Sequence, residues 1–318
     1  MSDAILFDRD QVDHLDALAD RPRRLSGSKL LWVDVHPGSD IGADEVAEAF
    51  QLDDTTRDYL MSPHERAVFD DHGRYIHITT YAPRESDEGK LHPLECVVGE
   101  NWVVTAHDGP IPVLDDFAAR VSGSGDTGSL DGPSFLAALL EWVLGSYTAA
   151  FERVEERLED FDVHAMRGEG KDKDIEKLVE MRLHVGTLRR ALAAHRSALV
   201  ALTHPELEAL GDNASGERFQ SLFARFEATL QEARDAREAI VGSFDVLIAR
   251  DGQQTNQIMK VLTLASVILL PGALLAGVMG MNFKVGFFQD AALFWVVVAV
   301  IVGFAPLTIG VAKRRGWI

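Results

Sequence analysis

A shortage of cysteine and of basic charge limits what this 318-residue chain can be. Cys96 is its single cysteine, so an intrachain disulfide and a thiolate zinc site are both excluded. The chain has 31 Lys and Arg against 50 Asp and Glu, which gives a net charge of −19. Nucleic acid and anionic lipid surfaces repel so acidic a chain, because they are negative themselves. We therefore expect no nucleic-acid partner, and the charge suits a protein that gathers cations.

Sequence motifs for catalysis are also missing. The chain has no phosphate-binding loop, no Gly-x-Ser-x-Gly elbow and no His-Glu-x-x-His helix. Its 11 histidines are scattered without the spacing of metal ligands. The first eight residues include two acidic ones, Asp3 and Asp8, and no basic one, whereas a signal peptide would begin with basic residues. We predict a protein that is not an enzyme, needs no catalytic cofactor and keeps its large N-terminal part in a reducing cytoplasm.

Formal charge is absent from two stretches near the C-terminus, residues 261–283 and 291–312. At about 1.5 Å per residue, a helix over either stretch would cross a hydrocarbon layer of roughly 30 Å. A buried core helix is the alternative, but core helices rarely exceed about 20 residues without charges on one side. We predict a membrane domain over residues 260–318, with spans at about 261–282 and 291–312.

Basic residues flank these two stretches on one side only. Lys260 precedes the first stretch and residues 313–315 follow the second, whereas the short connection 284–290 carries one charge of each sign. Because positive residues collect on the cytoplasmic side, both termini should face the cytoplasm. The expected location is the plasma (inner) membrane, crossed twice.

The N-terminal part alternates between strand-like and helix-like segments. Short apolar segments bounded by Gly, Pro or Asp predict strands at residues 30–35, 75–81, 95–98 and 102–105. Helical spacing appears between them, at residues 44–50 and 55–60. Residues 122–128 are too polar and glycine-rich for either element. We predict a cytoplasmic α/β domain over residues 1–132 with a central mixed sheet.

Long helices should follow in a second cytoplasmic region, residues 133–259. Apolar residues at three- and four-residue spacing predict an antiparallel pair at 134–166 and 173–202. From about Glu217 the pattern continues into the first span without a proline before Pro271. A helix of ~65 residues, roughly 95 Å long, must pack against neighbours or copies of itself. The predicted fold class is α+β, with a long helical stalk and two C-terminal transmembrane helices.

Small and polar residues recur along one line of the first span. The line steps alternately by three and four residues, and larger aliphatic residues fill the positions between. Its members are Asn256, Met259, Thr263, Ser266, Leu270, Ala273, Gly277 and Gly280. A period of 3.5 is typical of parallel helices packed around an axis. The pattern alone leaves two interpretations open, a water-filled pore and dry packing of small residues.

The same step continues backwards into the cytoplasmic part of the helix. It reaches Asp245, which would form an acidic ring at the cytoplasmic mouth if the helix were repeated around an axis. The alternative for this carboxylate is an ordinary charge on a solvated helix surface.

Three segments of this helix closely resemble the signature of the CorA family of magnesium and cobalt transport proteins. They are Asn256-Gln257-Ile258-Met259-Lys260-Val261-Leu262-Thr263, Leu270-Pro271, and Ala276-Gly277-Val278-Met279-Gly280-Met281-Asn282-Phe283. The family's hallmark is the Gly-Met-Asn triplet at the outer end of the first of two C-terminal spans. The resemblance extends weakly over nearly the whole chain. It implies a funnel-shaped homopentamer in a lipid bilayer, with Mg²⁺ as the transported ion and with Co²⁺ or Ni²⁺ as further candidates.

The resemblance also implies roles for individual residues. Asn282 would bind the hydrated ion at the outer entrance through its side-chain oxygen, on a turn shaped by Gly280 and Met281. Hydrogen bonds to the ion's water shell suit Mg²⁺, which loses water reluctantly. The implied pore lining is Asn256, Met259, Leu262, Leu270, Ala273 and Gly277, with Met259 and either Leu262 or Leu270 as an apolar constriction. In the family, metal bound between cytoplasmic carboxylates favours closure, so a divalent cation would also be a regulator.

The sequence departs from the family pattern at several points. Met279 stands where an aromatic residue is usual, and Ala273 stands at a polar pore position. The connection 284–290 is short and contains Lys284 where the family often has acidic residues. A related branch that resembles ZntB zinc transporters uses a variant of the triplet. Proton-coupled Zn²⁺ transport is therefore the alternative function.

Overall fold

The structure is a computed structural model of the chain. It describes residues 3–8, 11–22, 25, 29–63, 67–83, 91–123, 131–167, 171–204, 213–281 and 291–316. The chain divides into two compact units, Met1–Phe244 and Asp245–Ile318. The division falls inside one long helix and earlier than the border predicted at residues 259 and 260.

A mixed sheet forms the base of the first unit. In the described part of the chain it has seven strands in the order β2-β1-β3-β7-β6-β5-β4. Their bounds are β1 Ala4–Asp8, β2 Gln11–Leu15, β3 Lys29–Val35, β4 Phe69–Asp71, β5 Ile76–Pro83, β6 Leu91–Val98 and β7 Trp102–Ala106. The pair β3–β7 is parallel and the other pairs are antiparallel. The mixed sheet predicted from the sequence is confirmed.

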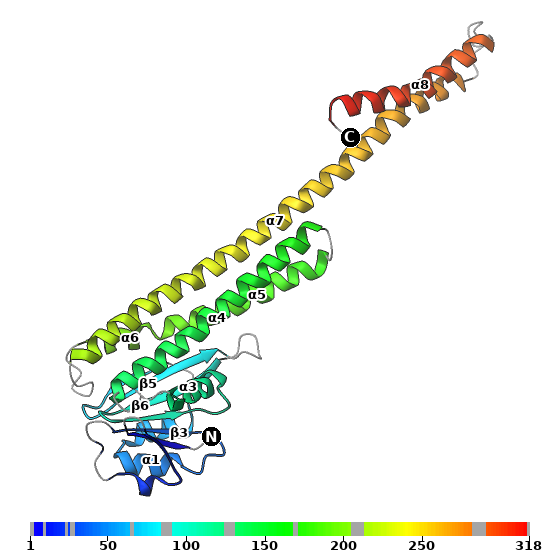
Figure 1. Cartoon of the computed structure of the whole chain (residues 1–318). Coiled ribbons are helices and arrows are strands. Elements are labelled where there is room, and N and C mark those ends of the chain that lie inside the picture. The colour runs from blue at the N-terminus through cyan, green and yellow to red at the C-terminus, as the bar shows by residue number, and fades with distance from the viewer. Residues whose placement is uncertain are drawn as a thin grey trace. The chain divides into compact units, whose positions relative to one another are not determined.

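Helices cover both faces of this sheet, which explains why β3 is apolar without interruption from Leu30 to Val33. Side chains alternate between faces along a strand, so Leu31 and Val33 pack in a core with residues of α1 (Ala43–Phe50) and α2 (Asp54–Met61). Trp32 points the other way, with ring centroids 6.0 Å from Phe117 and 5.4 Å from Phe135. Those two rings belong to α3 (Pro112–Gly123) and α4 (Gly132–Arg167). Figure 1 shows the sheet between α1 and α4.

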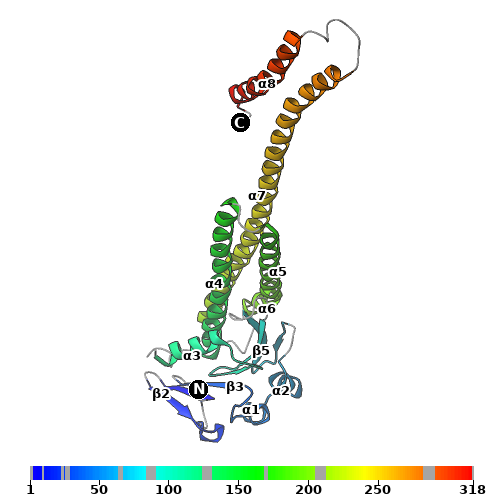
Figure 2. The same cartoon turned by 90° about the vertical axis from the view of Figure 1, so that its right-hand side faces the viewer.

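Three long helical segments run side by side above the sheet in Figures 1 and 2. They are α4, α5 (Lys171–Ala194) and the first half of α7 (Asn213–Met279). Apolar residues at helical spacing hold α7 in place, and they are fully or almost fully buried: Phe219, Phe226, Leu230, Ala233 and Ile240. The predicted helical region and the unbroken long helix are therefore present.

The structure differs from the sequence-based expectation at several elements. The helix expected over residues 173–202 is interrupted at His195, and α6 (Arg196–Leu202) follows. The hairpin β1–β2, the short strand β4, the helix α3 and the 3₁₀ turn η1 (Leu18–Asp20) were not predicted. Strand β4 has three residues, which is too few to show a period in the sequence.

The second unit consists of the end of α7 and the helix α8 (Ala291–Arg314). Both contain segments long and apolar enough to cross a membrane, and none of those segments is buried. Large side chains such as Val261, Leu274 and Trp295 are more than two-thirds exposed. Helix α4 is also long and apolar enough to cross a membrane, but most of its apolar segment is buried within the first unit. Exposed apolar surface of this extent distinguishes α7 and α8 from core helices.

Candidate ion pathway

One face of α7 turns toward α8. Leu264, Ile268, Gly272 and Met279 are spaced by four and seven residues and are all partly covered. Gly272, in the middle of this row, lies so close to α8 that a Cβ atom placed on it would be 3.3 Å from Cγ2 of Ile301. Small residues permit such an approach between membrane helices. This row is the α8-facing side of α7.

The predicted pore residues lie on the other side of the helix. Leu262, Thr263, Leu270, Ala273 and Gly277 are exposed along the whole segment. At 100° per residue, their mean direction is roughly half a turn away from the α8-facing row. The structure therefore brings these residues to one free face. We call it the seam, and it also includes Asn256, Met259 and Gly280, which are exposed, and Ser266, which is half-buried.

A shallow hollow runs along the seam beside a proline. It is lined by Leu262, Thr263, Ser266, Val267, Leu270 and Pro271. Pro271 lies inside α7 and has no N–H, so it cannot bond the carbonyl of Val267 as an ordinary helical residue would. The hydroxyl of Ser266 donates back to the carbonyl of Leu262 at 2.9 Å. The hollow thus combines apolar side chains with hydroxyl groups and a carbonyl without its helical partner.

The helix ends in a tightened turn just before the predicted entrance. The N–H of Gly280 donates to the carbonyl of Ala276 at 2.9 Å, and that of Met281 donates to Val278 at 3.3 Å. The change from a four-residue to a three-residue hydrogen bond closes α7. Met281 is exposed. Asn282, the predicted ion ligand, lies outside the described residues.

The predicted cytoplasmic mouth lies on an exposed part of the same helix. Asp245 is exposed and begins the second unit. It precedes Thr263 by 18 residues, which is about five helical turns, so both project from the same side of α7. Asn256 lies between them and is also exposed.

A regulatory metal site does not emerge from the described residues. Among them, no three or more His, Cys, Asp or Glu side chains lie together in a way that could hold a metal ion. The ligands of a regulatory cation therefore stay unassigned.

Two features of α7 were missed from the sequence. The close approach of Gly272 to α8 is one. The other is a row of polar contacts that ties the first half of α7 to α4. In this row Arg225 pairs with Glu141, and the hydroxyl of Thr148 donates to Glu232 at 3.0 Å. The sequence contains a signal for this row, because Glu141 and Thr148 in α4 are seven residues apart, and so are Arg225 and Glu232 in α7.

The chain thus has a mixed-sheet domain and one very long helix, α7, that ends in an apolar, unburied segment. With the second apolar helix, α8, this is the architecture of a membrane protein with two candidate C-terminal spans. The chain belongs to the family described as "CorA-like Mg2+ transporter protein", whose profile matches residues 27–314.

Curated relatives agree with this family. The chain is 21% identical over 293 residues to the cobalt/magnesium transport protein CorA of Methanocaldococcus jannaschii, covering 91% of this chain and 92% of that protein. It is 20% identical over 286 residues to the protein of the same name from Thermotoga maritima, covering 86% and 79%.

Solved structures agree with the fold. The complete structure of the CorA magnesium transporter from M. jannaschii has a TM-score of 0.80 and covers 99% of this chain and 98% of its own. The cytoplasmic domain of ZntB from Vibrio parahaemolyticus is a more distant neighbour, with 10% identity and a TM-score of 0.58. It covers 80% of this chain and all of its own. These likenesses confirm the α+β domain, the long helix and the C-terminal apolar helices.

Proposed function

We propose that this chain is one subunit of a homopentameric channel that carries divalent cations, with Mg²⁺ as the main ion and with Co²⁺ and Ni²⁺ as further ones. The observation that carries the proposal is the position of the seam, which lies on the face of α7 that α8 leaves free. A narrow, partly polar face of this kind suits a helix that lines an aqueous axis. Membership of a Mg²⁺ transporter family supports the choice of ion.

The pathway follows from the order of side chains along the seam. Asn282 would meet the hydrated ion at the outer entrance, and a neutral amide binds its water shell without trapping the ion. Gly277 and Ala273 leave room for a hydrated ion, while Thr263 and Ser266 offer hydroxyl groups. Large apolar residues at Leu270, Leu262 and Met259 would close the path by expelling water. Asn256 and Asp245 would then receive the ion on the cytoplasmic side.

The proposed assembly is a funnel with both termini in the cytoplasm of the plasma (inner) membrane. Residues 1–132 and 133–259 would form its cytoplasmic part, and residues 260–318 would cross the lipid. Lys260 and the basic residues 313–315 support this orientation. The membrane potential would drive entry with about 2.3 kcal/mol per charge per 100 mV. Binding of the same cation to cytoplasmic carboxylates would favour the closed state.

Proton-coupled transport of Zn²⁺ is the competing function. The likeness to a ZntB domain concerns the fold alone, because the identity is 10%. The sequence departs from the CorA family pattern at Met279, Ala273 and the connection 284–290. The identity of the transported ion therefore has to be measured. The two functions differ in ion preference and in proton coupling, since only the second links flux to a proton gradient.

Uptake into proteoliposomes tests the proposal. The purified protein would be reconstituted, and the initial rates for Mg²⁺, Co²⁺, Ni²⁺ and Zn²⁺ would be compared with and without a pH difference. We expect Mg²⁺ uptake that follows membrane potential and ignores the pH difference. Zinc uptake that requires the pH difference would instead establish the competing function. Native mass spectrometry in lipid nanodiscs would give the number of subunits, and a monomer would exclude a shared pore.

A further inference from the structure

Helices α4 and α7 run in the same direction and share a row of polar contacts at regular intervals. Glu141 of α4 pairs with Arg225 of α7, and one heptad later Thr148 bonds Glu232. Both pairs join residues 84 positions apart. A step of one heptad toward the start of both helices brings together Ser134 and Arg218, which have the same separation. The row therefore has three levels.

The first level lacks the negative partner that the others have. Arg218 is exposed, and within the described part of the chain it makes no hydrogen bond or ion pair. Ser134 is only 6% exposed, yet its hydroxyl forms no hydrogen bond to any described residue. Its N–H is satisfied separately, by Oδ1 of Asp131 at 2.7 Å. Among the described residues, the hydroxyl of a nearly buried serine and an exposed guanidinium group thus both lack a protein partner at the level where an acceptor belongs.

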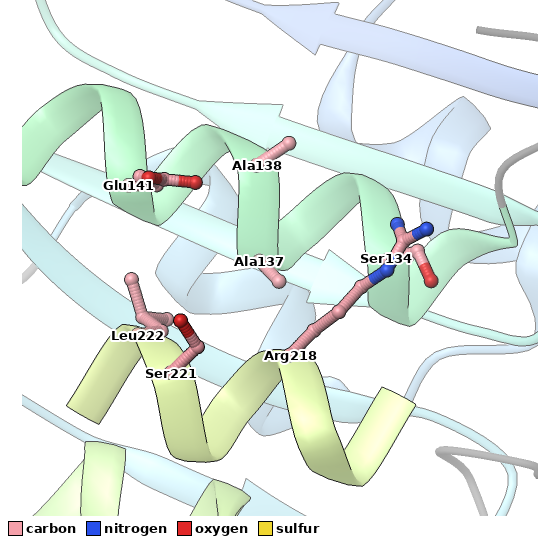
Figure 3. Close-up of a pocket in the computed structure, with 7 residues that line it drawn as sticks. All are labelled: Ser134, Ala137, Ala138, Glu141, Arg218, Ser221 and Leu222. Carbon is pink, nitrogen blue, oxygen red and sulfur yellow. The ribbon is translucent and has the colours of Figure 1, made fainter. Parts of the chain in front are cut away.

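A hollow of about 230 Å³ occupies this level. It is lined by Ser134, Ala137, Ala138 and Glu141 of α4 and by Arg218, Ser221 and Leu222 of α7. Figure 3 shows the side chain of Arg218 extending from α7 toward Ser134 on α4. The two alanines are too small to fill the space between the helices. The hollow is therefore open where the row would otherwise continue.

The chemistry of the lining selects the ligand. Arg218, Ser134 and Ser221 are hydrogen-bond donors, and they line the hollow from two different helices. The one carboxylate in the lining, Glu141, is already neutralised by Arg225. A planar carboxylate paired with the guanidinium group has only the same two oxygens, both in one plane, to share with the hydroxyls. A tetrahedral phosphate group keeps further oxygens for the two hydroxyls.

We propose that this hollow binds a phosphate group, either inorganic phosphate or the phosphoryl end of a small metabolite such as a nucleotide. The bound group would complete the polar row and would join the first turns of α4 and α7. Neither helix start is otherwise bonded to the other at this level within the described residues. The site is separate from the seam, so the inference does not depend on which ion the protein carries.

Calorimetric titration of the full-length protein tests the proposal. The protein would be held in nanodiscs of neutral lipid without Mg²⁺, and inorganic phosphate and adenosine monophosphate would be added separately. We expect saturable binding by the wild type and at least tenfold weaker binding by Arg218→Gln. Arg237→Gln is the matched control, because Arg237 is an exposed arginine of the same helix outside the hollow. Tighter binding of adenosine monophosphate than of phosphate would assign the site to a nucleotide, and equal binding would assign it to the phosphate group alone.

A second variant supplies the missing charge from the protein itself. Ser134→Glu places a carboxylate where Glu141 stands one heptad later, so it should pair with Arg218, raise the melting temperature and abolish phosphate binding. Three results would overturn the proposal. They are absence of phosphate binding by the wild type, equal binding by the wild type and Arg218→Gln, and undiminished binding by Ser134→Glu.

Discussion

The imidazole of His195 accepts a hydrogen bond from the backbone N–H of Tyr81 at 2.9 Å, although the residues are 114 positions apart. The residue opposite Tyr81 in β6 is Pro93, which has no N–H to contribute to the ladder. The hydroxyl of Tyr147 donates to the carbonyl of Tyr81 at 2.8 Å. Helical side chains therefore satisfy both backbone groups of Tyr81, and His195 does so at the break between α5 and α6.

Removal of this acceptor should destabilise the first unit. His195→Ala leaves the buried N–H of Tyr81 unpaired and creates a cavity, at a combined cost of about 2–4 kcal/mol in the free energy of unfolding. His195→Gln keeps an acceptor at a similar reach and should lose about half as much. Urea unfolding of the detergent-solubilised protein, followed by circular dichroism, would measure both. His204→Ala, at an exposed histidine, is the control and should change little.

The same histidine predicts a dependence of stability on pH. Burial lowers the pKa of His195 from 6.5 to about 4. The folded state thus keeps the ring neutral where the unfolded chain takes up a proton, so its contribution is complete above pH 6.5 and declines as the pH falls toward 4. The loss reaches about 3 kcal/mol. The difference in unfolding free energy between wild type and His195→Gln should shrink over this pH range, and a constant difference would contradict the prediction.

Cysteine accessibility distinguishes the two faces of α7. The native chain provides a clean background, because its single cysteine, Cys96, is fully buried. Ala273→Cys and Gly277→Cys lie on the seam, and a Cβ at Gly277 meets no atom within 4 Å. We expect a charged, membrane-impermeant thiol reagent to modify both and to block ion uptake. Leu264→Cys and Ile268→Cys, on the α8-facing side, should not react. Equal modification of cysteines on both faces of α7 would show that the seam is not the ion pathway.

The proposed entrance depends on one amide. Asn282→Ala removes the side-chain oxygen that would bind the water shell of the ion, so Mg²⁺ uptake into proteoliposomes should fall to the level of empty vesicles. Gln289→Ala removes another amide from the same connecting segment and should leave uptake intact. Retained Mg²⁺ uptake by Asn282→Ala would show that Asn282 does not form the entrance.

The proposed cytoplasmic mouth depends on a carboxylate. Asp245→Ala should shift the internal Mg²⁺ concentration at which uptake stops, while the order of preference among Mg²⁺, Co²⁺ and Ni²⁺ stays the same. Proteoliposomes loaded with graded internal Mg²⁺ would measure this. Glu159→Ala changes an exposed carboxylate of α4 and serves as the control. A changed ion preference with an unchanged threshold would place Asp245 in selection instead of gating.

The sequence predicted those elements that depend on local pattern. The long helix was predictable because apolar spacing continues from Glu217 and no proline precedes Pro271. The interruption at His195 was not, because neither glycine nor proline marks it, and the hydrogen bond that His195 makes there is to a distant strand. The hairpin β1–β2 was missed because β1 gains its place beside the edge strand β2 only when β3 pairs with its other side.

The candidate site shows the same division between local and distant information. A period of 3.5 residues was enough to bring the seam residues to one face. Which face α8 covers depends on Gly272 meeting Ile301 across the connection, and no spacing within α7 encodes that contact. The hollow near Arg218 likewise depends on two helices 84 residues apart in sequence, so a reading of either helix alone shows only a charged surface.

The parallel pairing of β3 with β7 has a consequence for the order of events during synthesis. The centre of the sheet cannot close until Ala106 has left the ribosome, since Val35 pairs with it. The first apolar span is translated much later, from residue 261 onward. The sheet can therefore be complete before any segment destined for lipid emerges, and insertion of α7 and α8 would begin on a chain whose N-terminal fold is already finished.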